Sequence, residues 1–356
     1  MRGSDNIRVL VIGGGIAGAA LARRLGRAGA EVHLIERQKA IGGRVREMGC
    51  KATTVCLRCN VCVADEILRT LSGTPGVHIH TSAQLAELQP GRNGRRYAAI
   101  LADGRQFAVD AVVAAVGYEP FNPVENAAYG GGRIPNVMTG AEAERQLAGH
   151  HRIVRPSDQA APRRIAFVQC VGSRTEEVFR RPEDTDYCST VCCAYALRMA
   201  RRIRHQSPEA EITVFYMDIQ NFGKGFDEFY RECRNTLRFI RSRPYELRPG
   251  VAGSVRVKYA AERRPDGEAA RPVHEEDFDL VVLAVGIRPA ADAAALAANL
   301  GAPVDAQGFL GLKTASALPD MQRAGLFTVG ACESPKDIAA CIAQAEAVGA
   351  MILQKP

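Results

Sequence analysis

Residues 7–18 read IRVLVIGGGIAG, an apolar run followed at once by glycines, and residues 17–28 then have a helix-like composition. Gly13, Gly15 and Gly18 therefore have the spacing GxGxxG between a strand and a helix. Gly13 permits a tight turn, Gly15 lets a pyrophosphate approach the backbone, and Gly18 allows the helix to pack closely on the strand. The stretch predicts an α/β domain that binds a dinucleotide.

The residues around and after this loop extend the prediction. Ile16 and Ala17 open the helix, whose unpaired N–H groups and positive dipole end are expected to face the phosphates. A second strand, residues 31–35 (EVHLI), ends in Glu36, which lies 18 residues after Gly18. An acidic side chain at this place accepts a hydrogen bond from a ribose 2′-hydroxyl, so it favours FAD or NAD over a 2′-phosphorylated nucleotide.

The next residues favour FAD over NAD. Residues 36–44 read ERQKAIGGR. They resemble the ERxxxxGG(R/K) extension of flavoproteins with two dinucleotide-binding domains, in which the extension borders the flavin. The resemblance implies that Arg37, Gly43 and Arg44 lie at the cofactor.

The C-terminal stretch, residues 325–349, resembles the closing FAD motif of the same flavoproteins, which is a strand, a glycine turn and a helix aimed at the cofactor. That motif carries Asp after Gly, whereas Ala331 follows Gly330 here. The departure removes the usual ribityl contact. Asp337 and the backbone at Ile338 are the expected substitutes.

An internal repeat indicates two related halves. Residues 109–120 read VDAVVAAVGYEP and residues 278–289 read FDLVVLAVGIRP, with Asp, Val-Val, Ala-Val-Gly and Pro at the same offsets. Each is expected to be a buried strand that ends in a glycine turn, at Gly117 in the first copy. The predicted fold class is α/β, with two Rossmann-like dinucleotide-binding domains.

We expect the FAD-binding domain to be discontinuous, from residues 1–150 and 305–356, with residues 160–300 as the inserted second domain. Residues 152–162, which are polar and contain two prolines, are the expected linker. The second domain should open with a strand at 164–171 and continue with a helix at 191–205. An NAD(P)H-binding domain needs GxGxxG after its first strand. The second domain of this chain has QCVGSR (169–174) at that place, so we expect it not to bind NAD(P)H.

Cysteines stand in place of that lost loop. Cys170 follows an apolar run, and YCSTVCC (187–193) supplies Cys188, Cys192 and Cys193. Four thiolates in short-spaced groups are the ligands of an iron–sulfur cluster. Zinc is a weaker alternative because it usually takes CxxC pairs, and disulfides require an oxidising compartment.

A second set, Cys50, Cys56, Cys59 and Cys62, has similar short spacing. It is the second candidate for a cluster, with zinc as its alternative. Cys233, Cys332 and Cys341 are interpreted as packing residues.

Composition limits the remaining function classes. The chain has 356 residues, 47% of them hydrophobic, and no apolar run approaches the ~20 residues of a membrane span. The net charge is +7, and basic runs at 198–204 and 231–243 are interpreted as solvated helix faces with sparse aromatic interleaving. We therefore expect no nucleic acid and no membrane span. The start has no signal-peptide pattern, so the cytoplasm is the expected location.

Five motifs together resemble a known family, the A subunits of heterodisulfide reductase: QCVGSR (169–174), YCSTVCC (187–193), FGKGFDEFY (222–230), FIRSRP (239–244) and ESPKDI (333–338). The resemblance implies a thioredoxin-reductase-like flavoprotein fold that holds FAD, and a 4Fe-4S cluster on Cys170, Cys188, Cys192 and Cys193. It implies an electron-transfer subunit that works with B- and C-type subunits, with a sulfur-carrier protein as a further candidate partner. A homodimer is expected from the relatives of the fold.

The chain also departs from that family. Larger methanogen-type subunits carry extra domains that we do not expect in this protein, and the resemblance places Arg198 where the family has a lysine near flavin N5. Arginine keeps its proton, so it would stabilise reduced flavin without shuttling a proton. The resemblance is therefore to the compact form in heterodisulfide-reductase-like complexes of sulfur oxidisers, without electron bifurcation. Arg198 and Lys336 are the candidate catalytic residues.

Two other functions fit parts of the pattern. An NAD(P)H-dependent disulfide reductase would use Cys56 with Cys59, or Cys59 with Cys62, as a CxxC pair. A zinc-stabilised FAD-binding scaffold would use the same cysteines without redox chemistry. The missing second GxGxxG disfavours the reductase.

Overall fold

The structure of the protein is a computed structural model that describes residues 7–92, 94–175, 177, 180–181, 184–221, 223–260, 272–311 and 324–354. Phe222, the first residue of one motif above, lies outside these ranges, as does part of the 305–356 segment. The chain divides into two compact units. The first contains residues 1–46, 60–119 and 288–356, and the second contains residues 47–59 and 120–287.

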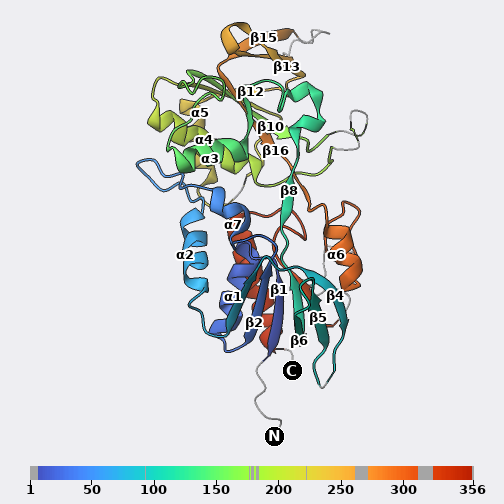
Figure 1. The fold of residues 1–356 in the computed structure, drawn as a ribbon. Helices are drawn as coiled ribbons and strands as arrows, with labels where there is room; N and C mark the ends of the chain where they lie inside the picture. The colour runs from blue at the N-terminus through green and yellow to red at the C-terminus, as the bar shows by residue number, and fades with distance from the viewer. Residues whose placement is uncertain are drawn as a thin grey trace. The chain divides into compact units, whose positions relative to one another are not determined.

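The first unit is built on a five-stranded parallel sheet with the order β18-β7-β1-β2-β3 (Figure 1). These strands are β1 (Arg8–Ile12), β2 (Glu31–Glu36), β3 (Val77–Thr81), β7 (Ala111–Ala114) and β18 (Leu326–Thr328). Three helices cover one face, α1 (Ile16–Arg27), α2 (Val61–Leu71) and α7 (Ile338–Gln354). An antiparallel sheet covers the other, made of β4 (Leu85–Pro90), β5 (Tyr97–Leu101) and β6 (Gln106–Val109), beside α6 (Ala293–Leu300).

The alternation of side chains along β1 explains these two layers. Val9 and Val11 pack among the helices, whereas Leu10 and Ile12 pack toward the antiparallel sheet. All four are buried, as expected for a parallel strand covered on both faces.

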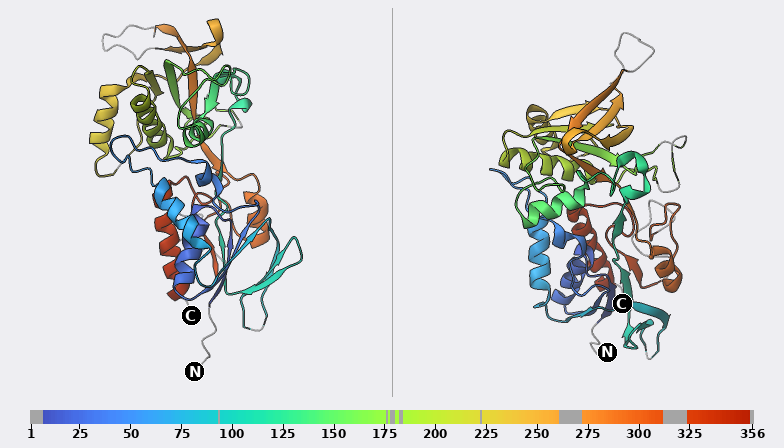
Figure 2. Two further views of the ribbon diagram at one scale, coloured as in Figure 1. Left: turned by 60° about the vertical axis from the view of Figure 1, so that its left-hand side comes forward. Right: turned by 45° about the horizontal axis from the view of Figure 1, so that its top comes forward.

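The second unit repeats this plan, with a parallel sheet in the order β12-β11-β10-β16-β9. Figure 2 shows its helices and strands in two further views. Its strands are β9 (Val137–Thr139), β10 (Arg164–Val171), β11 (Glu211–Tyr216), β12 (Arg238–Arg241) and β16 (Leu280–Val285). The helices α3 (Gly140–Gly149), α4 (Cys192–Gln206) and α5 (Phe226–Thr236) share one apolar core with this sheet. An antiparallel sheet of β13 (Glu246–Pro249), β14 (Val255–Ala260) and β15 (Val273–Phe278) completes the unit. The strand order matches that of the first unit, as the sequence repeat predicts.

The boundaries of the units differ from the expected domain boundaries in three stretches. Residues 120–150 belong to the second unit because β9 pairs with β16 in parallel register. Residues 288–304 belong to the first unit, where α6 lies against β4. Residues 47–59 belong to the second unit. Two short strands, β8 (Tyr118–Pro120) and β17 (Ile287–Pro289), pair where the chain passes from one unit to the other.

Candidate functional site

The glycine loop of the first unit joins β1 directly to α1. Gly13 has φ +107°, and a Cβ there would lie 2.5 Å from the carbonyl oxygen of Ala115. A Cβ on Gly18 would overlap the carbonyl oxygen of Gly13. Gly15 differs, because a Cβ there would meet nothing within 4 Å. Gly13 and Gly18 are therefore required by packing, whereas Gly15 borders open space at the start of α1, where no side chain caps the helix.

Glu36 lies at the end of β2 and is buried. Its carboxylate accepts hydrogen bonds from the N–H groups of Gly14 and Gln38, both at 2.8 Å. The side chain thus holds the glycine loop in place, a role that the sequence did not predict. A carboxylate has further acceptor sites, so a ribose hydroxyl can still bind it.

The other predicted cofactor residues of the first unit come close to this loop. A Cβ on Gly43 would lie 3.3 Å from the Cα of Gly15. The guanidinium of Arg44 donates to the carbonyl of Tyr118 at 3.2 Å, next to Gly117, which has φ +72°. Arg37 instead forms an exposed ion pair with Asp292 at 2.8 Å.

The C-terminal motif packs on α1 as expected. A Cβ on Gly330 would lie 2.5 Å from the Cβ of Ala17, the second residue of α1. The N–H of Gly330 donates to Gln344 at 2.8 Å. Asp337, which precedes α7, accepts from the N–H of Ala340 at 2.8 Å. Ala331 is buried and Ile338 begins α7.

The predicted cofactor residues of this unit, apart from Arg37, thus surround two helix N-termini and an open glycine position. This arrangement can hold an extended, doubly phosphorylated ligand, because the orphan N–H groups at a helix start bind phosphate oxygens. The cradle at Gly15, which a Cβ would partly fill, fits a dinucleotide.

The cysteines of the second unit gather where β10 ends and α4 begins. Cys170 is buried and has φ +58°, at a point where the register between β10 and β16 shifts. Cys192 and Cys193 are the first two residues of α4 and are buried, while Cys188 is half-buried. The 20 residues 172–191 replace the three glycines that join β1 to α1. The cysteines therefore occupy the place of a phosphate-binding loop.

The thiols of this set influence one another. A hydrogen bond with Cys192, together with the positive charges of Arg174 and Arg243, lowers the pKa of Cys170 to about 7. Hydrogen bonds with Cys170 and Cys193 raise the pKa of Cys192 well above its ordinary value. The hydrogen bond with Cys192 lowers the pKa of Cys193, and burial raises that of Cys188. Hydrogen bonding within the set therefore favours the ionised form of Cys170 and Cys193 over that of Cys192.

Two arginines surround this set, and neither of them was assigned a role from the sequence. Arg174 forms a two-pronged ion pair with Asp218, whose backbone carbonyl lies 4.0 Å from the sulfur of Cys193. Arg243 donates at 3.2 Å to the backbone carbonyl of Cys170. Both arginines stand in quoted motifs, QCVGSR and FIRSRP, but their contacts span up to 73 residues of sequence.

Buried polar groups beside Cys170 also lack partners. Gln169 is 2% exposed, and neither atom of its side-chain amide has a hydrogen-bond partner in the described part of the chain. The same is true of the hydroxyl of Ser173. Burying unpaired donors is costly, so these groups fit a site that another acceptor completes.

The described residues hold no group of three or more His, Cys, Asp or Glu side chains arranged around a single metal position. The thiols of Cys170, Cys192 and Cys193 instead contact one another. The donor set fits an iron–sulfur cluster in chemistry, because it offers four sulfurs, nearby positive charge and buried donors that can bind sulfide.

The other cysteine set divides between the two units. Cys50, Cys56 and Cys59 belong to the second unit, and Cys62, near the start of α2, belongs to the first. Cys50, Cys56 and Cys62 are exposed, and Cys59 is half-buried. The sulfurs of Cys50 and Cys56 each accept an N–H from two residues further on, at 3.4 Å. Cys188 does the same at 3.3 Å. All eleven cysteines are free thiols.

The two candidate catalytic residues have protein partners. Arg198 donates from Nε to the carbonyl of Leu57 at 2.8 Å. Lys336 donates to Glu333 at 3.2 Å and to Ser334 at 2.6 Å. Their action on a flavin stays a prediction.

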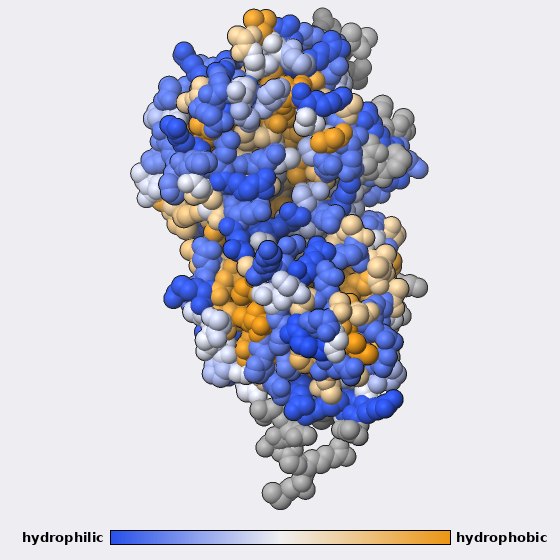
Figure 3. Space-filling view, in the orientation of Figure 1, coloured by the Kyte–Doolittle hydropathy of each residue, from blue (hydrophilic) through white to orange (hydrophobic). Residues whose placement is uncertain are grey.

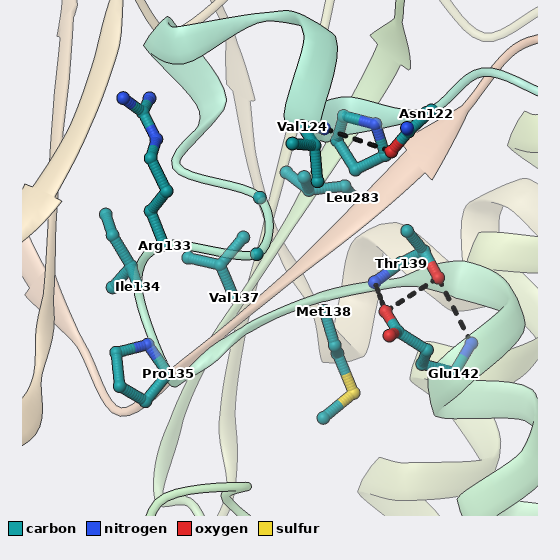
Figure 4. Close-up of a pocket in the computed structure, with 13 residues that line it drawn as sticks. Asn122, Val124, Arg133, Ile134, Pro135, Val137, Met138, Thr139, Glu142 and Leu283 are labelled. Atoms are coloured by element: carbon teal, nitrogen blue, oxygen red, sulfur yellow. Dashed lines mark hydrogen bonds between the residues drawn. The ribbon is translucent and has the colours of Figure 1, made fainter.

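Surface features add little to this arrangement. A cavity of about 370 Å³ in the second unit is lined by Met138, Thr139, Glu142 and neighbouring residues, and none of the predicted site residues lines it (Figure 4). On the face shown in Figure 3, apolar residues form separate groups on a largely hydrophilic surface. No helix within the described ranges is long and apolar enough to cross a membrane.

Comparison with known sequences points to one family. Residues 11–49 match the family described as an NAD(P)-binding Rossmann-like domain. The chain is 36% identical over 253 residues to the A subunit of the H(2):CoB-CoM heterodisulfide,ferredoxin reductase of Methanothermobacter thermautotrophicus, covering 68% of this chain and 36% of that protein. It is 31% identical over 429 aligned positions to the second iron-sulfur A subunit of the CoB–CoM heterodisulfide reductase of Methanopyrus kandleri, covering 96% of this chain and 63% of that protein. The chain thus spans from about a third to under two thirds of the length of these relatives.

Solved structures confirm the expected fold. Thioredoxin reductase of Lactococcus lactis superimposes with a TM-score of 0.60 at 17% identity, over 98% of each chain. An NAD-dependent persulfide reductase of A. fulgidus gives 0.57 at 16% identity, over 98% of this chain and 60% of that one. At such low identity these similarities concern the fold alone.

Proposed function

Because the chain belongs to the family of heterodisulfide reductase A subunits, we propose that it is an FAD- and 4Fe-4S-dependent electron-transfer subunit of a heterodisulfide-reductase-like complex. One observation carries the proposal: both units have the same strand–loop–helix arrangement, β1 to α1 in the first and β10 to α4 in the second. The first unit has an open glycine cradle between β1 and α1, and the second has Cys170, Cys188, Cys192 and Cys193 at the matching place. The family relationship makes the chain an oxidoreductase component.

Bound FAD would supply two-electron chemistry, and a cluster would supply one-electron transfer. The chain's own residues bind and tune these groups. The N-terminus of α1 and the open position at Gly15 hold the pyrophosphate, and Glu36 orients the ribose. Arg174 and Arg243 place positive charge beside the thiolates. This charge would stabilise the reduced, more negative state of a cluster bound there. Arg198 and Lys336 are the proposed charges near the flavin.

The proposal extends to the setting of the reaction. We place the subunit in the cytoplasm, where exposed thiols such as Cys50 and Cys56 stay reduced, with B- and C-type subunits as partners. A sulfur-carrier protein and a second copy of the chain are further proposed partners. Arg198, in place of a proton-shuttling lysine, supports sulfur oxidation without bifurcation.

The first test is anaerobic purification followed by iron, zinc and flavin analysis. We expect about four irons per chain, a flavin spectrum and a fast-relaxing S = 1/2 signal after reduction. Cys192→Ser should lose the iron, and Cys341→Ser, a buried cysteine outside both sets, should keep it. Zinc without iron, or full iron in Cys192→Ser, would contradict the proposal.

The second test separates the relay from an NAD(P)H-dependent disulfide reductase. NADPH is added to the oxidised protein without oxygen, and flavin absorbance is followed. We expect slow or no bleaching, because the 20 residues 172–191 take the place of the glycine loop that would bind the phosphates of NADPH. Rapid bleaching would favour the reductase.

A further inference from the structure

The exposed cysteine segment, residues 47–59, has little apolar anchoring of its own. Within it only Lys51 and Leu57 are buried. It has no helix or strand beyond the last residue of a 3-10 turn at Gly43–Glu47. A segment of this kind should fray unless polar contacts hold it.

Two buried charged residues hold its first part. Lys51 is 3% exposed and forms an ion pair with Glu144 of α3, which is 7% exposed. Glu144 also accepts from the N–H of Gly49 at 2.9 Å, and Lys51 donates to the carbonyl of Gly49 at 2.7 Å. A Cβ on Gly49 would lie 3.0 Å from the Cα of Ala148, so the backbone itself touches α3.

Arginines of α4 hold the same segment from the other side. Arg202 is 8% exposed and donates to the backbone carbonyl of Cys50 and, at 3.1 Å, to that of Leu147. Arg198, one turn earlier, donates to the carbonyl of Leu57 at 2.8 Å. These arginines bind backbone carbonyls, so they do not engage the thiols of Cys50, Cys56 and Cys59.

The start of α3 is itself secured. Thr139 and Glu142 form a capping box, with the hydroxyl of Thr139 accepting from the N–H of Glu142 at 3.2 Å, and Glu142 accepting from the N–H of Thr139 at 2.6 Å (Figure 4). The helix that carries Glu144 is therefore a firm support.

We propose that Glu144, Lys51, Arg198 and Arg202 form a clamp that presets the position of Cys50, Cys56 and Cys59 before any metal or partner engages these thiols. Buried ion pairs contribute little net stability, so the role that we assign to this one is to fix the position of the segment. Because α4 begins with Cys192 and Cys193, the clamp ties this segment to the helix of the other cysteine set. A preset thiol position lowers the ordering cost of binding. The clamp consists of the chain's own residues and does not depend on the proposed cofactors.

The test uses the full chain, chelator-treated to remove metal, and follows tryptic cleavage after Lys51 by mass spectrometry and hydrogen exchange of residues 47–59. Arg202→Met and Glu144→Gln should each speed cleavage roughly tenfold or more, because a buried hydrogen-bonding group loses its partner. Arg202→Lys should restore part of the protection. Arg204→Met is the matched control, since Arg204 of the same helix donates to Ala210 instead. Exchange in β10 and β16 should stay unchanged.

A second variant decides between the clamp and ligation by the thiols. The triple change Cys50→Ser, Cys56→Ser, Cys59→Ser should keep Lys51 protected, because the clamp contacts backbone groups and the Lys51 side chain and does not contact the thiols. Loss of protection in the triple variant, or unchanged protection in both Arg202→Met and Glu144→Gln, would overturn the proposal. If Arg202→Met does not fold, Glu144→Gln and the triple variant still decide.

Discussion

The carboxylate of Asp279 accepts a hydrogen bond from the backbone N–H of Arg164 at 2.8 Å. Asp110 accepts from the N–H of Arg8 at the same distance. Arg8 and Arg164 begin the central strands β1 and β10, and the two aspartates occupy the same place in the repeat at 109–120 and 278–289. The repeated Asp therefore links the start of each central strand, through a hydrogen bond, to the segment that begins the adjacent strand, β7 or β16.

Asp279→Ala should destabilise the second unit by about 2 kcal/mol, because the N–H groups of Arg163 and Arg164 both lose a charged acceptor. Urea unfolding measures the change. Asp292→Ala, which removes an exposed ion pair with Arg37, is the control and should change stability little. Equal effects of the two substitutions would refute the role of Asp279.

Gly15→Ala and Gly18→Ala should behave differently. Gly15 has room for a methyl group and extended backbone angles, so the variant should keep its melting temperature without flavin but bind FAD more weakly. Gly18→Ala should lower the melting temperature itself, since its Cβ would overlap the carbonyl of Gly13. Flavin-free melting and FAD titration separate the effects. Tight FAD binding by Gly15→Ala would argue against a pyrophosphate at that position.

Arg243→Met should lower the reduction potential of the proposed cluster by tens of millivolts, with about 59 mV equal to about 1.4 kcal/mol for one electron. The reason is the loss of a positive charge beside Cys170, which destabilises the more negative reduced state. A redox titration followed by EPR measures it. Arg238→Met, whose arginine pairs with Glu276, should leave the potential unchanged.

Acidification should weaken the first unit through His33. Burial, together with the nearby His80 and His78, lowers the pKa of His33 below 6.5, although Glu31 opposes the shift. His33 also stacks on Phe107 with ring centres 4.2 Å apart, and Arg105 contacts His80. Because the unfolded chain binds the proton more readily, stability should fall as pH drops below 6.5.

Urea unfolding at about pH 7.5 and about pH 5.5 tests this pH dependence. His33→Gln should reduce the difference between the two conditions, whereas His150→Gln, at an exposed position, should not. An unchanged difference in His33→Gln would assign the pH dependence to other groups.

Local sequence patterns predicted many of the helices and strands. The expected strands at 7–12, 31–35 and 164–171 match β1, β2 and β10 to within a residue, and the expected helices match α1 and α4. These elements were predictable because strand and helix periodicity, and the steric need for glycine at Gly13 and Gly18, are written in consecutive residues.

Which segments of the chain belong to which unit was less predictable. Residues 120–150 join the second unit because β9 pairs with β16, a strand more than 130 residues later. Residues 47–59 join it through Lys51, Arg198 and Arg202. No local pattern reports such pairings, because their free energy comes from contacts between distant parts of the chain.

The sequence by itself determined that the chain has a glycine cradle, a duplicated α/β plan and two sets of closely spaced cysteines, since each depends on residue type at short separation. Only the tertiary structure decided what surrounds them: Glu36 on the loop at Gly14, Arg174 and Arg243 beside Cys170, and Arg202 on the carbonyl of Cys50. Charge and hydrogen bonding act over a few ångströms in space, and the fold alone brings residues so far apart in sequence within that range.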